Sequence, residues 1–439
     1  MLELIKRTVK EFIEISKNKE IQIVSHNDTD GITSAAILTK ALSRQGKKFS
    51  TKIVKNLDKE TINSLPQDKL LIFLDLASNS FEHLSKLKTK IFILDHHEII
   101  SSVPNNISIV NPHIVNEEEI SGAGVTYLFA KELNKENIDL AHLAVIGMVG
   151  DQLEKNPGKL NNEIIKDSKI ILKKGLIMYP ATRPIDRVLE YCSEIFIPEV
   201  TGSSIGTFNF LRNIGMAKKN GRFKSIIELT EEETSKIITS ITLQRIDEGD
   251  PSELIGNIYL TNFFDNLEDA RQVSATINAC SRLGESGTAI SYCLENKTAK
   301  KRVDKIYATY KREIVKALNS VPEFKKIEDK NYLIINAEDK IKDTVIGTVA
   351  SILSHSRNYQ QGKAIIAMAY NENKIKISAR MVGKSGKNIR EVLNSVIEII
   401  GGEVGGHPAA AGAIIEKHKE NEFVEELKKK LEVELIKVK

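Results

Sequence analysis

The sequence predicts an α/β protein in which two α/β units are joined by a helical region. Residues 20–155 alternate short apolar runs of strand length with helical patterns, at 21–25, 33–46, 70–76, 81–90 and 91–95. This alternation is typical of a parallel sheet whose strands are connected by helices. Strand patterns return only after about residue 330, and most of the sequence between has a helical period.

These patterns divide the 439 residues into three parts. We predict a parallel-sheet domain over residues 1–165, a mostly helical connecting region over 166–325, and a smaller α/β domain over 326–439. A chain of this length is expected to form two or three domains, each large enough to bury a core.

Residues 1–20 have an amphipathic helical pattern in which charges interrupt the apolar positions every two or three residues. A secretory signal would need an uninterrupted apolar segment instead. No run in the sequence approaches the roughly 20 apolar residues of a membrane-spanning helix. We therefore expect a cytoplasmic protein without a membrane partner.

The overall charge is nearly balanced, because Lys plus Arg exceed Asp plus Glu by only four. This balance excludes a polycation but allows local basic surfaces that would suit a selective nucleic-acid enzyme. The three cysteines, Cys192, Cys280 and Cys293, form no C-x-x-C pair, so neither a disulfide framework nor a structural zinc site is indicated.

In the last third of the chain, strand patterns occupy 331–339, 363–371 and 374–380, with helical segments between them. A glycine-rich stretch at 401–412 follows, GGEVGGHPAAAG, and we expect it to contain a loop. These elements predict the second α/β unit.

Carboxylate and histidine side chains follow three of the predicted strands of the first domain. Asp28 and Asp30 come after the first strand, Asp75 ends the next apolar run, and residues 95–97 read Asp-His-His. The ligand crevice of an open α/β sheet lies at these strand ends. In an extended backbone Asp28 and Asp30 would point to one side, roughly 6 to 7 Å apart, and could serve two different metal ions.

A two-metal site would explain why these residue types come together. Asp75 could bridge ions that lie about 3.5 to 4 Å apart, while His96 and Asp151 add an imidazole and another carboxylate. Carboxylate and imidazole ligands without thiolate favour Mn²⁺, with Mg²⁺ or Co²⁺ as substitutes. The alternative is that each Asp caps a helix. Capping would not require Asp and His at successive strand ends.

These segments resemble the motifs of the DHH phosphoesterase superfamily, which is named after the tripeptide found here at 95–97, and the resemblance extends from about residue 20 to the C-terminus. It implies that one metal is held by Asp28 and Asp75, with His26 as a ligand or orienting group. The second metal would be held by Asp30, Asp75, His96 and Asp151.

The same resemblance assigns roles beside the metals. His97 would face the scissile phosphate, and Asp95 would fix the imidazole of a neighbouring histidine. The chemistry implied is in-line attack of metal-activated water on a phosphodiester, in which His97 stabilises charge or protonates the leaving oxygen.

The C-terminal unit resembles the DHH-associated domain, which holds the end of the substrate. Gly405 and Gly406 would let backbone N–H groups approach a phosphate or base, and His407 would add a donor. Arg380 could donate two hydrogen bonds to a phosphate. A tight turn would equally explain the two glycines taken alone.

The length of the connecting region and the NACSRLG segment at 278–284 resemble RecJ-like members, and Arg282 in that segment could reach a phosphate. Two basic stretches, at 297–316 and 380–390, fit a polymeric substrate. The first also contains Tyr307 and Tyr310, which could stack bases. A solvated helix face is the alternative for the first stretch.

Bacterial RecJ usually has Asp where His26 stands, so the chain resembles the archaeal RecJ-like branch. We predict a Mn²⁺-dependent exonuclease on single-stranded DNA or RNA, with a role in DNA replication or repair and with the GINS complex or a helicase as possible partners. The alternatives are an oligoribonuclease (nanoRNase) or cyclic-dinucleotide phosphodiesterase, and a non-catalytic replication scaffold.

Overall fold

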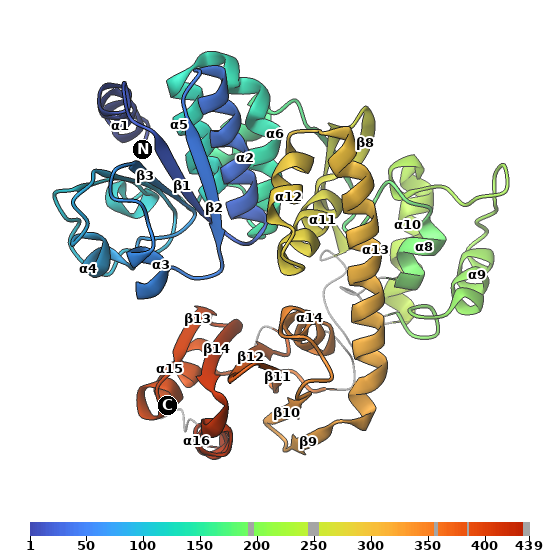
Figure 1. Ribbon diagram of the computed structural model, residues 1–439. Helices are drawn as coiled ribbons and strands as arrows, with labels where there is room; N and C mark the ends of the chain where they lie inside the picture. Colours follow the sequence, from blue (N-terminus) through green and yellow to red (C-terminus); the bar gives the residue numbers. More distant parts are fainter. Residues whose placement is uncertain (192–196, 245–253, 355–358, 384–385, 433–439) are drawn as a thin grey trace, which may run out of the picture. The chain divides into compact units, whose positions relative to one another are not determined.

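The computed structural model describes residues 1–191, 197–244, 254–354, 359–383 and 386–432 (Figure 1). It consists of two compact units. The first comprises Met1–Val188 and Phe208–Tyr307, and the second comprises Leu189–Thr207 and Ala308–Lys439. In the part of the chain described, no helix is both long and apolar enough to cross a membrane. Cys192 lies outside the described residues, whereas Cys280 and Cys293 are buried free thiols.

The first unit is built on a five-stranded parallel sheet with strand order β2-β1-β3-β4-β5. The strands are β1 Ile21–His26, β2 Phe49–Val54, β3 Leu70–Leu74, β4 Ile91–Leu94 and β5 Ile107–Val110. The predicted α/β fold class is therefore confirmed. The sequence patterns did not reveal the two edge strands, and β2 is only partly buried along most of its length.

Seven helices precede, connect or follow these strands. They are α1 Leu2–Ile15, α2 Thr29–Arg44, α3 Lys59–Asn63, α4 Phe81–Leu84, α5 Gly122–Leu133, α6 Ala141–Gly150 and α7 Lys159–Asp167. The amphipathic pattern at the N-terminus forms α1 as expected. Two predicted helices were misplaced: the one expected at 33–46 begins four residues earlier, and the one expected at 81–90 ends at Leu84, after which the chain turns towards β4.

Alternation along the strands gives the sheet two apolar faces. On one face Ile21, Ile23 and Ile72 pack with helices α1, α2, α5 and α6. On the other face Val24 and Phe73 pack in a second core together with α3 and α4. Both faces are covered, as a parallel sheet requires.

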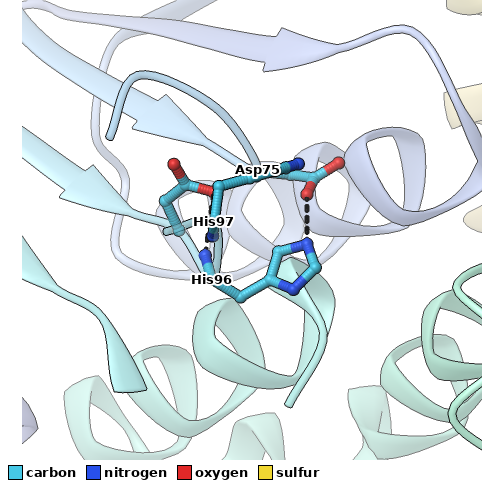
Figure 2. A group of neighbouring side chains, drawn as sticks. Asp75, His96 and His97 are labelled. Carbon is cyan, nitrogen blue, oxygen red and sulfur yellow. Dashed lines mark hydrogen bonds and ion pairs between the residues drawn. The ribbon is translucent and has the colours of Figure 1, made fainter. Parts of the chain in front are cut away.

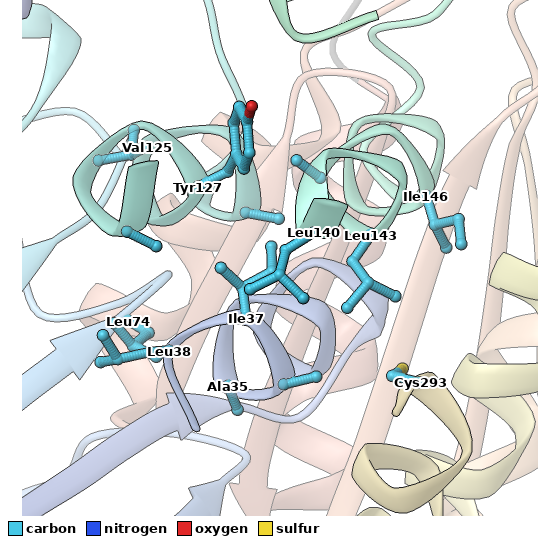
Figure 3. Packing of buried hydrophobic residues seen from close by; sticks show 14 of the residues in the cluster. Ala35, Ile37, Leu38, Leu74, Val125, Tyr127, Leu140, Leu143, Ile146 and Cys293 are labelled. Carbon is cyan, nitrogen blue, oxygen red and sulfur yellow. The ribbon is translucent and has the colours of Figure 1, made fainter. Parts of the chain in front are cut away.

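Helix α2 lies at the centre of the first core. Twelve of its sixteen residues are buried, and its side chains pack against β3, α5 and α6 (Figure 3). Because α2 directly follows β1, this packing fixes the turn between the two elements.

The middle of the chain is mostly helical, as predicted, but it also contains a three-stranded antiparallel sheet of order β6-β7-β8 that the sequence patterns did not reveal. Its strands are β6 Ile171–Leu176, β7 Ile255–Phe263 and β8 Asn266–Asp269. The helices are α8 Ile185–Tyr191, α9 Ser204–Asn213, α10 Glu231–Gln244, α11 Ala270–Arg282, α12 Ser286–Cys293 and α13 Lys297–Ser320.

The second unit contains a six-stranded mixed sheet of order β13-β14-β12-β11-β10-β9. The strands are β9 Lys325–Glu328, β10 Tyr332–Asn336, β11 Ala364–Asn371, β12 Lys374–Met381, β13 Glu403–His407 and β14 Ala410–Glu416. Helices α15 Ile389–Ile400 and α16 Glu420–Glu432 share a core with the sheet, and α14 Asp343–Ser354 packs on β11 and β12.

The packing of α1 offers a test of the first unit. Phe12 is fully buried, and its ring meets those of Phe92 and Phe129 edge to face at 5.5 Å. Removing the ring in Phe12→Ala leaves a cavity and should lower the free energy of unfolding by about 3 to 5 kcal/mol in urea denaturation. Ile13→Ala is the matched control, because Ile13 is 45% exposed. Equal losses in the two variants would contradict this packing.

Candidate metal centre

The register of the first sheet brings three strand ends together. Ser25 of β1 lies opposite Leu74 of β3, and Leu74 lies opposite Leu94 of β4. The residues that follow them, including Asp75, therefore leave the sheet side by side. In the strand order of this sheet, β1 and β3 flank the point where the connection reverses, and ligands of open α/β sheets bind at that point.

Asp75 adopts a left-handed backbone conformation directly after β3, with φ of 57°, and its N–H donates to the carbonyl of Leu94 at 2.9 Å. This conformation is uncommon for a residue with a side chain and tends to occur at functional sites.

The two carboxylate oxygens of Asp75 face different histidines. Oδ2 lies 3.6 Å from Nδ1 of His26. Oδ1 lies 3.2 Å from Nε2 of His96, as Figure 2 shows. Each histidine has a further carboxylate beside it. Asp28 Oδ2 lies 2.9 Å from His26 Nδ1, and Asp151 Oδ2 lies 3.3 Å from His96 Nε2.

The side chains consequently form three groups in which the possible ligand atoms all lie within 4.8 Å of one another, and one of these groups contains Asp75, Asp95, His96 and His97. The other two are built from the residues for which the sequence suggested metal binding. The first of these two contains His26, Asp28 and Asp75, and the second contains Asp30, His96 and Asp151. Asp75 also lies beside the second group through His96. The structure thus brings together all six residues for which the sequence suggested metal binding.

The geometry expected for Asp28 and Asp30 was wrong. Asp28 itself is extended, but the helix begins at the next residue, because the Asp28 carboxylate accepts the N–H of Gly31 at 2.9 Å as the N-cap of α2. Asp30 lies in the first turn of that helix. Its carboxylate accepts the N–H groups of Gly122 and Ala123, at 2.5 and 2.9 Å, and so also caps α5. For these two residues, helix capping and metal binding are compatible.

Two glycines that the sequence did not single out make room for these carboxylates. A Cβ on Gly122 would lie 2.7 Å from Cβ of Asp75 and 3.0 Å from Oδ2 of Asp30. A Cβ on Gly147 would lie 2.5 Å from Oδ1 of Asp30. Such distances are shorter than real contacts, so both positions exclude any larger residue while the carboxylates stay in place.

Crowding of carboxylates in a buried place perturbs their ionisation. Burial and the neighbouring Asp75 and Asp28 carboxylates raise the pKa of Asp30 to about 7. Burial and the charge of Asp30 also raise the pKa of Asp151 well above its ordinary value. Burial alone would lower the pKa of His96, but Asp75 and Asp151 outweigh it and raise that pKa instead. A cation in the site would relieve this repulsion between like charges.

Three buried atoms of the site fit this need for a cation. Nδ1 of His26, Oδ2 of Asp75 and Oδ2 of Asp151 make no hydrogen bond of acceptable geometry with any residue that the structure describes. Buried polar atoms are normally paired, so the absence of hydrogen-bond partners among the described residues for these atoms, which belong to the two ligand groups, suits metal coordination. The donor set is oxygen and imidazole nitrogen, which suits Mn²⁺ and Mg²⁺.

His97 lies beside this centre and is held by Asp95. Nδ1 of His97 is 2.7 Å from Oδ1 of the fully buried Asp95, and this carboxylate also accepts the backbone N–H groups of His96 and Ser78. Burial alone would raise the pKa of Asp95, but the hydrogen bond and the charge of His97 outweigh burial and lower this pKa. A carboxylate on Nδ1 sets the tautomer that leaves Nε2 of His97 available.

Asn111, whose role the sequence did not reveal, supports the same loop. Its amide donates to the carbonyl of His97 at 2.9 Å and to Oγ of Ser78 at 3.0 Å, and the residue is fully buried. Its function depends on contacts with residues distant in sequence, which a local pattern does not contain.

Helices α11 and α12 bind the loop that follows β1. The amide of Asn27 donates to the carbonyl of Ser281, and Oγ of Ser286 donates to Oδ1 of Asn27 at 2.8 Å. Arg282, proposed from the sequence as a phosphate contact, is the last residue of α11. It directly follows Ser281, whose carbonyl accepts the bond from Asn27. The connecting region thus supports the metal-binding loop.

The remaining sequence-based candidates lie in the second unit. Arg380 is on β12, where Nε donates to Oγ of Ser351 at 2.9 Å. The glycine-rich segment contains a turn, but at Pro408 and Ala409: Gly405, Gly406 and His407 are exposed residues of β13, which pairs with β14. Their proposed contacts with substrate stay predictions.

Tyr310 is unsuited to the base stacking suggested by its sequence context. It is only 7% exposed, and its hydroxyl lies 2.7 Å from Oγ1 of Thr348. A base could not stack on it without displacing these contacts.

Three domain families match the chain in order. They are described as the DHH family N-terminal domain, over residues 20–148, the DHH-CID domain, over 179–258, and the DHHA1 domain, over 329–433. An uncharacterized protein of Methanocaldococcus jannaschii is 29% identical, with the alignment covering 96% of this chain and 95% of that protein.

Several solved structures share the fold. RecJ of Thermus thermophilus in complex with Mn²⁺ matches with a TM-score of 0.62 and 18% identity over 98% of this chain, which spans 54% of that RecJ. An exonuclease RecJ bound to manganese matches with a TM-score of 0.60 and 17% identity, over 99% of this chain and 95% of that one. CDC45 from Entamoeba histolytica has a TM-score of 0.68 and 13% identity, over 98% and 99% of the two chains.

The close approach at Gly122 leads to a testable expectation. In Gly122→Ala the new methyl group would push against Asp75 and Asp30, and it should weaken Mn²⁺ binding about 10- to 100-fold in isothermal titration calorimetry. Gly287→Ala is the control, because a Cβ at Gly287 meets nothing within 4 Å. Unchanged Mn²⁺ affinity in Gly122→Ala would contradict the site geometry.

The raised pKa values of Asp30, Asp151 and His96 all have the same consequence for metal binding. Near pH 6 the metal-free site holds protons that a bound cation must expel, whereas near pH 8 fewer protons remain. Mn²⁺ affinity should therefore increase as the pH rises through about 7, the pKa of Asp30, and fewer protons should be released at pH 8 than at pH 6. Calorimetry in buffers of different ionisation enthalpy measures this release. A proton count that is independent of pH would contradict the ionisation states described.

Proposed function

We propose that this chain, a RecJ-like member of the DHH superfamily, is a metal-dependent phosphodiesterase. It would remove nucleotides from the end of single-stranded DNA or RNA. The observation that carries the proposal is the shared carboxylate of Asp75, whose oxygens face His26 on one side and His96 on the other. This arrangement supports two cations bridged by one residue, as in enzymes that cleave phosphodiesters.

The donor groups assign ligands to each proposed cation. Asp28, His26 and Asp75 would hold the first, and the second would be held by Asp75, Asp30, His96 and Asp151. When bound, such cations neutralise phosphate charge and lower the pKa of water. We infer that manganese is the resident ion, with magnesium or cobalt as substitutes, and the donor set and the manganese-bound RecJ relatives support this choice.

His97 would act on the substrate itself. With its Nδ1 against Asp95, the ring can present Nε2 to a phosphate oxygen or to the leaving oxygen. The bonds to Asp95 outweigh burial and raise the pKa of His97, which favours the protonated ring. A protonated imidazole can stabilise charge on a phosphate or donate a proton to the departing oxygen.

The second candidate function is a non-catalytic scaffold in a replication complex. The similarity to CDC45 favours it, since that fold match covers nearly the whole of both chains. The complete donor set argues against it, because a scaffold has no need of four carboxylates around two histidines. We also propose that the chain binds the GINS complex or a helicase, and the similarity to CDC45 supports this partner class. The Methanocaldococcus relative supports membership of an archaeal branch.

The proposed activity is tested by incubating end-labelled single strands with and without Mn²⁺. We expect nucleotides to be released only with metal, and labels at the 5′ or 3′ end give the polarity. If wild-type protein cleaves dinucleotides but leaves 20-mers intact, the alternative of an oligoribonuclease replaces the exonuclease. A protein inert on all strands would support the scaffold.

The bridging residue gives a sharper test. Asp75→Asn keeps the shape but removes the charge shared by the two proposed cations, so strand cleavage should fall by at least about 10³-fold. Asp68→Asn is a matched control on the exposed surface of the same unit. His97→Ala should lower kcat by about 10²- to 10⁴-fold while Mn²⁺ binding is retained. Full activity in Asp75→Asn would contradict the proposed role of Asp75.

A further inference from the structure

The first nine residues of helix α13 carry an unusual concentration of positive charge. Residues 297–305 contain five basic residues and one acidic residue, a formal charge of +4 that equals the net charge of the whole chain. This segment belongs to the first unit, which also contains the metal centre.

Three of these basic residues form one exposed row. Lys297, Lys301 and Lys305 are spaced four residues apart, which places them within an arc of about 80° on the helix. Ala299 and Val303 are buried on the opposite side, in the core of the unit. The three lysines, which we call the basic row, therefore point away from the core.

The other two basic residues of the segment have structural partners. Arg302 pairs with Glu285 at 2.6 Å, and Nζ of Lys300 lies 4.8 Å from the ring centre of Phe264. No ion pair within the described part of the chain involves the basic row. The helical period places the exposed Asp304 on the same side of α13 as the row, so the formal charge of this side is +2.

The basic row is also placed where it opposes helix formation. Helix α13 begins at Lys297, and positive charge near the N-terminus of a helix is unfavourable because of the helix dipole. Lys297 and Lys301, and then Lys301 and Lys305, are like-charged pairs at i and i+4, which repel each other. A feature that breaks local rules without a compensating contact points to a function.

The start of α13 is connected to the metal-binding loop by a short series of contacts. Arg302 binds Glu285, the N-cap of α12, and the next residue, Ser286, donates to Asn27. Asn27 immediately precedes Asp28 in the metal centre. A phosphate chain bound along the basic row would thus be held by an element that is fixed to the loop carrying a proposed ligand.

We propose that the basic row of Lys297, Lys301 and Lys305 is a secondary binding surface for the phosphate backbone of a single nucleic-acid strand, separate from the site of cleavage. The proposal rests on the proposed nuclease function for its choice of partner. Lysine ammonium groups suit phosphates as point charges, without base preference. The row should increase affinity for long strands and have no effect on the cleavage of very short ones.

The test uses full-length protein in which all three lysines are replaced, Lys297→Gln, Lys301→Gln and Lys305→Gln. Binding of fluorescent dT20 and U20 is followed by anisotropy in EDTA, which prevents hydrolysis, at a series of salt concentrations. Loss of three phosphate contacts should lower the slope of log affinity against log salt by about 2, at roughly 0.7 for each contact to a single strand. Affinity at low salt should fall on the order of tenfold.

The matched control replaces three exposed lysines of the same unit that lie outside the basic row, Lys10→Gln, Lys17→Gln and Lys19→Gln. It removes the same charge and should leave the slope within error of the wild-type value. Cleavage of a dinucleotide in Mn²⁺ should be equal in all three proteins. The thermal unfolding temperature of the α13 variant should be unchanged or higher, because helix repulsion is relieved.

The possible results separate this proposal from the proposed activity. If the α13 variant matches the control in slope and affinity, the basic row is only a solvated surface or binds another kind of partner, and the proposal is overturned even if wild-type protein degrades strands. If wild-type protein binds strands through the basic row but never cleaves them, the surface is supported and the nuclease function fails.

Discussion

The first unit depends on one constraint, the left-handed conformation of Asp75 at the end of β3. It turns the carboxylate across the strand ends, so that one oxygen faces His26 from β1 and the other faces His96 after β4. An extended residue at this position would continue the strand instead. Because sheet register aligns the three strand ends, this single turn is enough to connect two groups of potential ligands.

Holding several carboxylates together in a buried place is costly, and the structure offsets this cost with backbone donors. Asp28 and Asp30 cap the helices α2 and α5, where N–H groups and the helix dipole stabilise negative charge. The glycines at 122 and 147 allow the helices to approach closely enough for this purpose. The packing of α2 between the sheet, α5 and α6 therefore also sets the positions of the carboxylates in the site.

The fold class and the RecJ-like resemblance were predictable, because apolar runs of strand length and the Asp-His-His tripeptide are local patterns. Helix boundaries were less predictable. The pattern at 33–46 did not reveal that Asp28 would be the N-cap of α2 or that Asp30 would lie in the first turn of that helix. The roles of Asn111 and Gly122 were beyond local patterns, since their contacts join segments far apart in sequence. The stretch containing Gly405 and Gly406 has the composition of a loop, but pairing with β14 makes it a strand.

The bridging role proposed for Asp75 requires two cations in a single site. Anomalous diffraction from crystals grown with Mn²⁺, recorded at the manganese absorption edge, tests it most directly. We expect two peaks, one on either side of the Asp75 carboxylate, with His26 and Asp28 beside one and His96 and Asp151 beside the other. A single peak, or peaks that avoid Asp75, would contradict it.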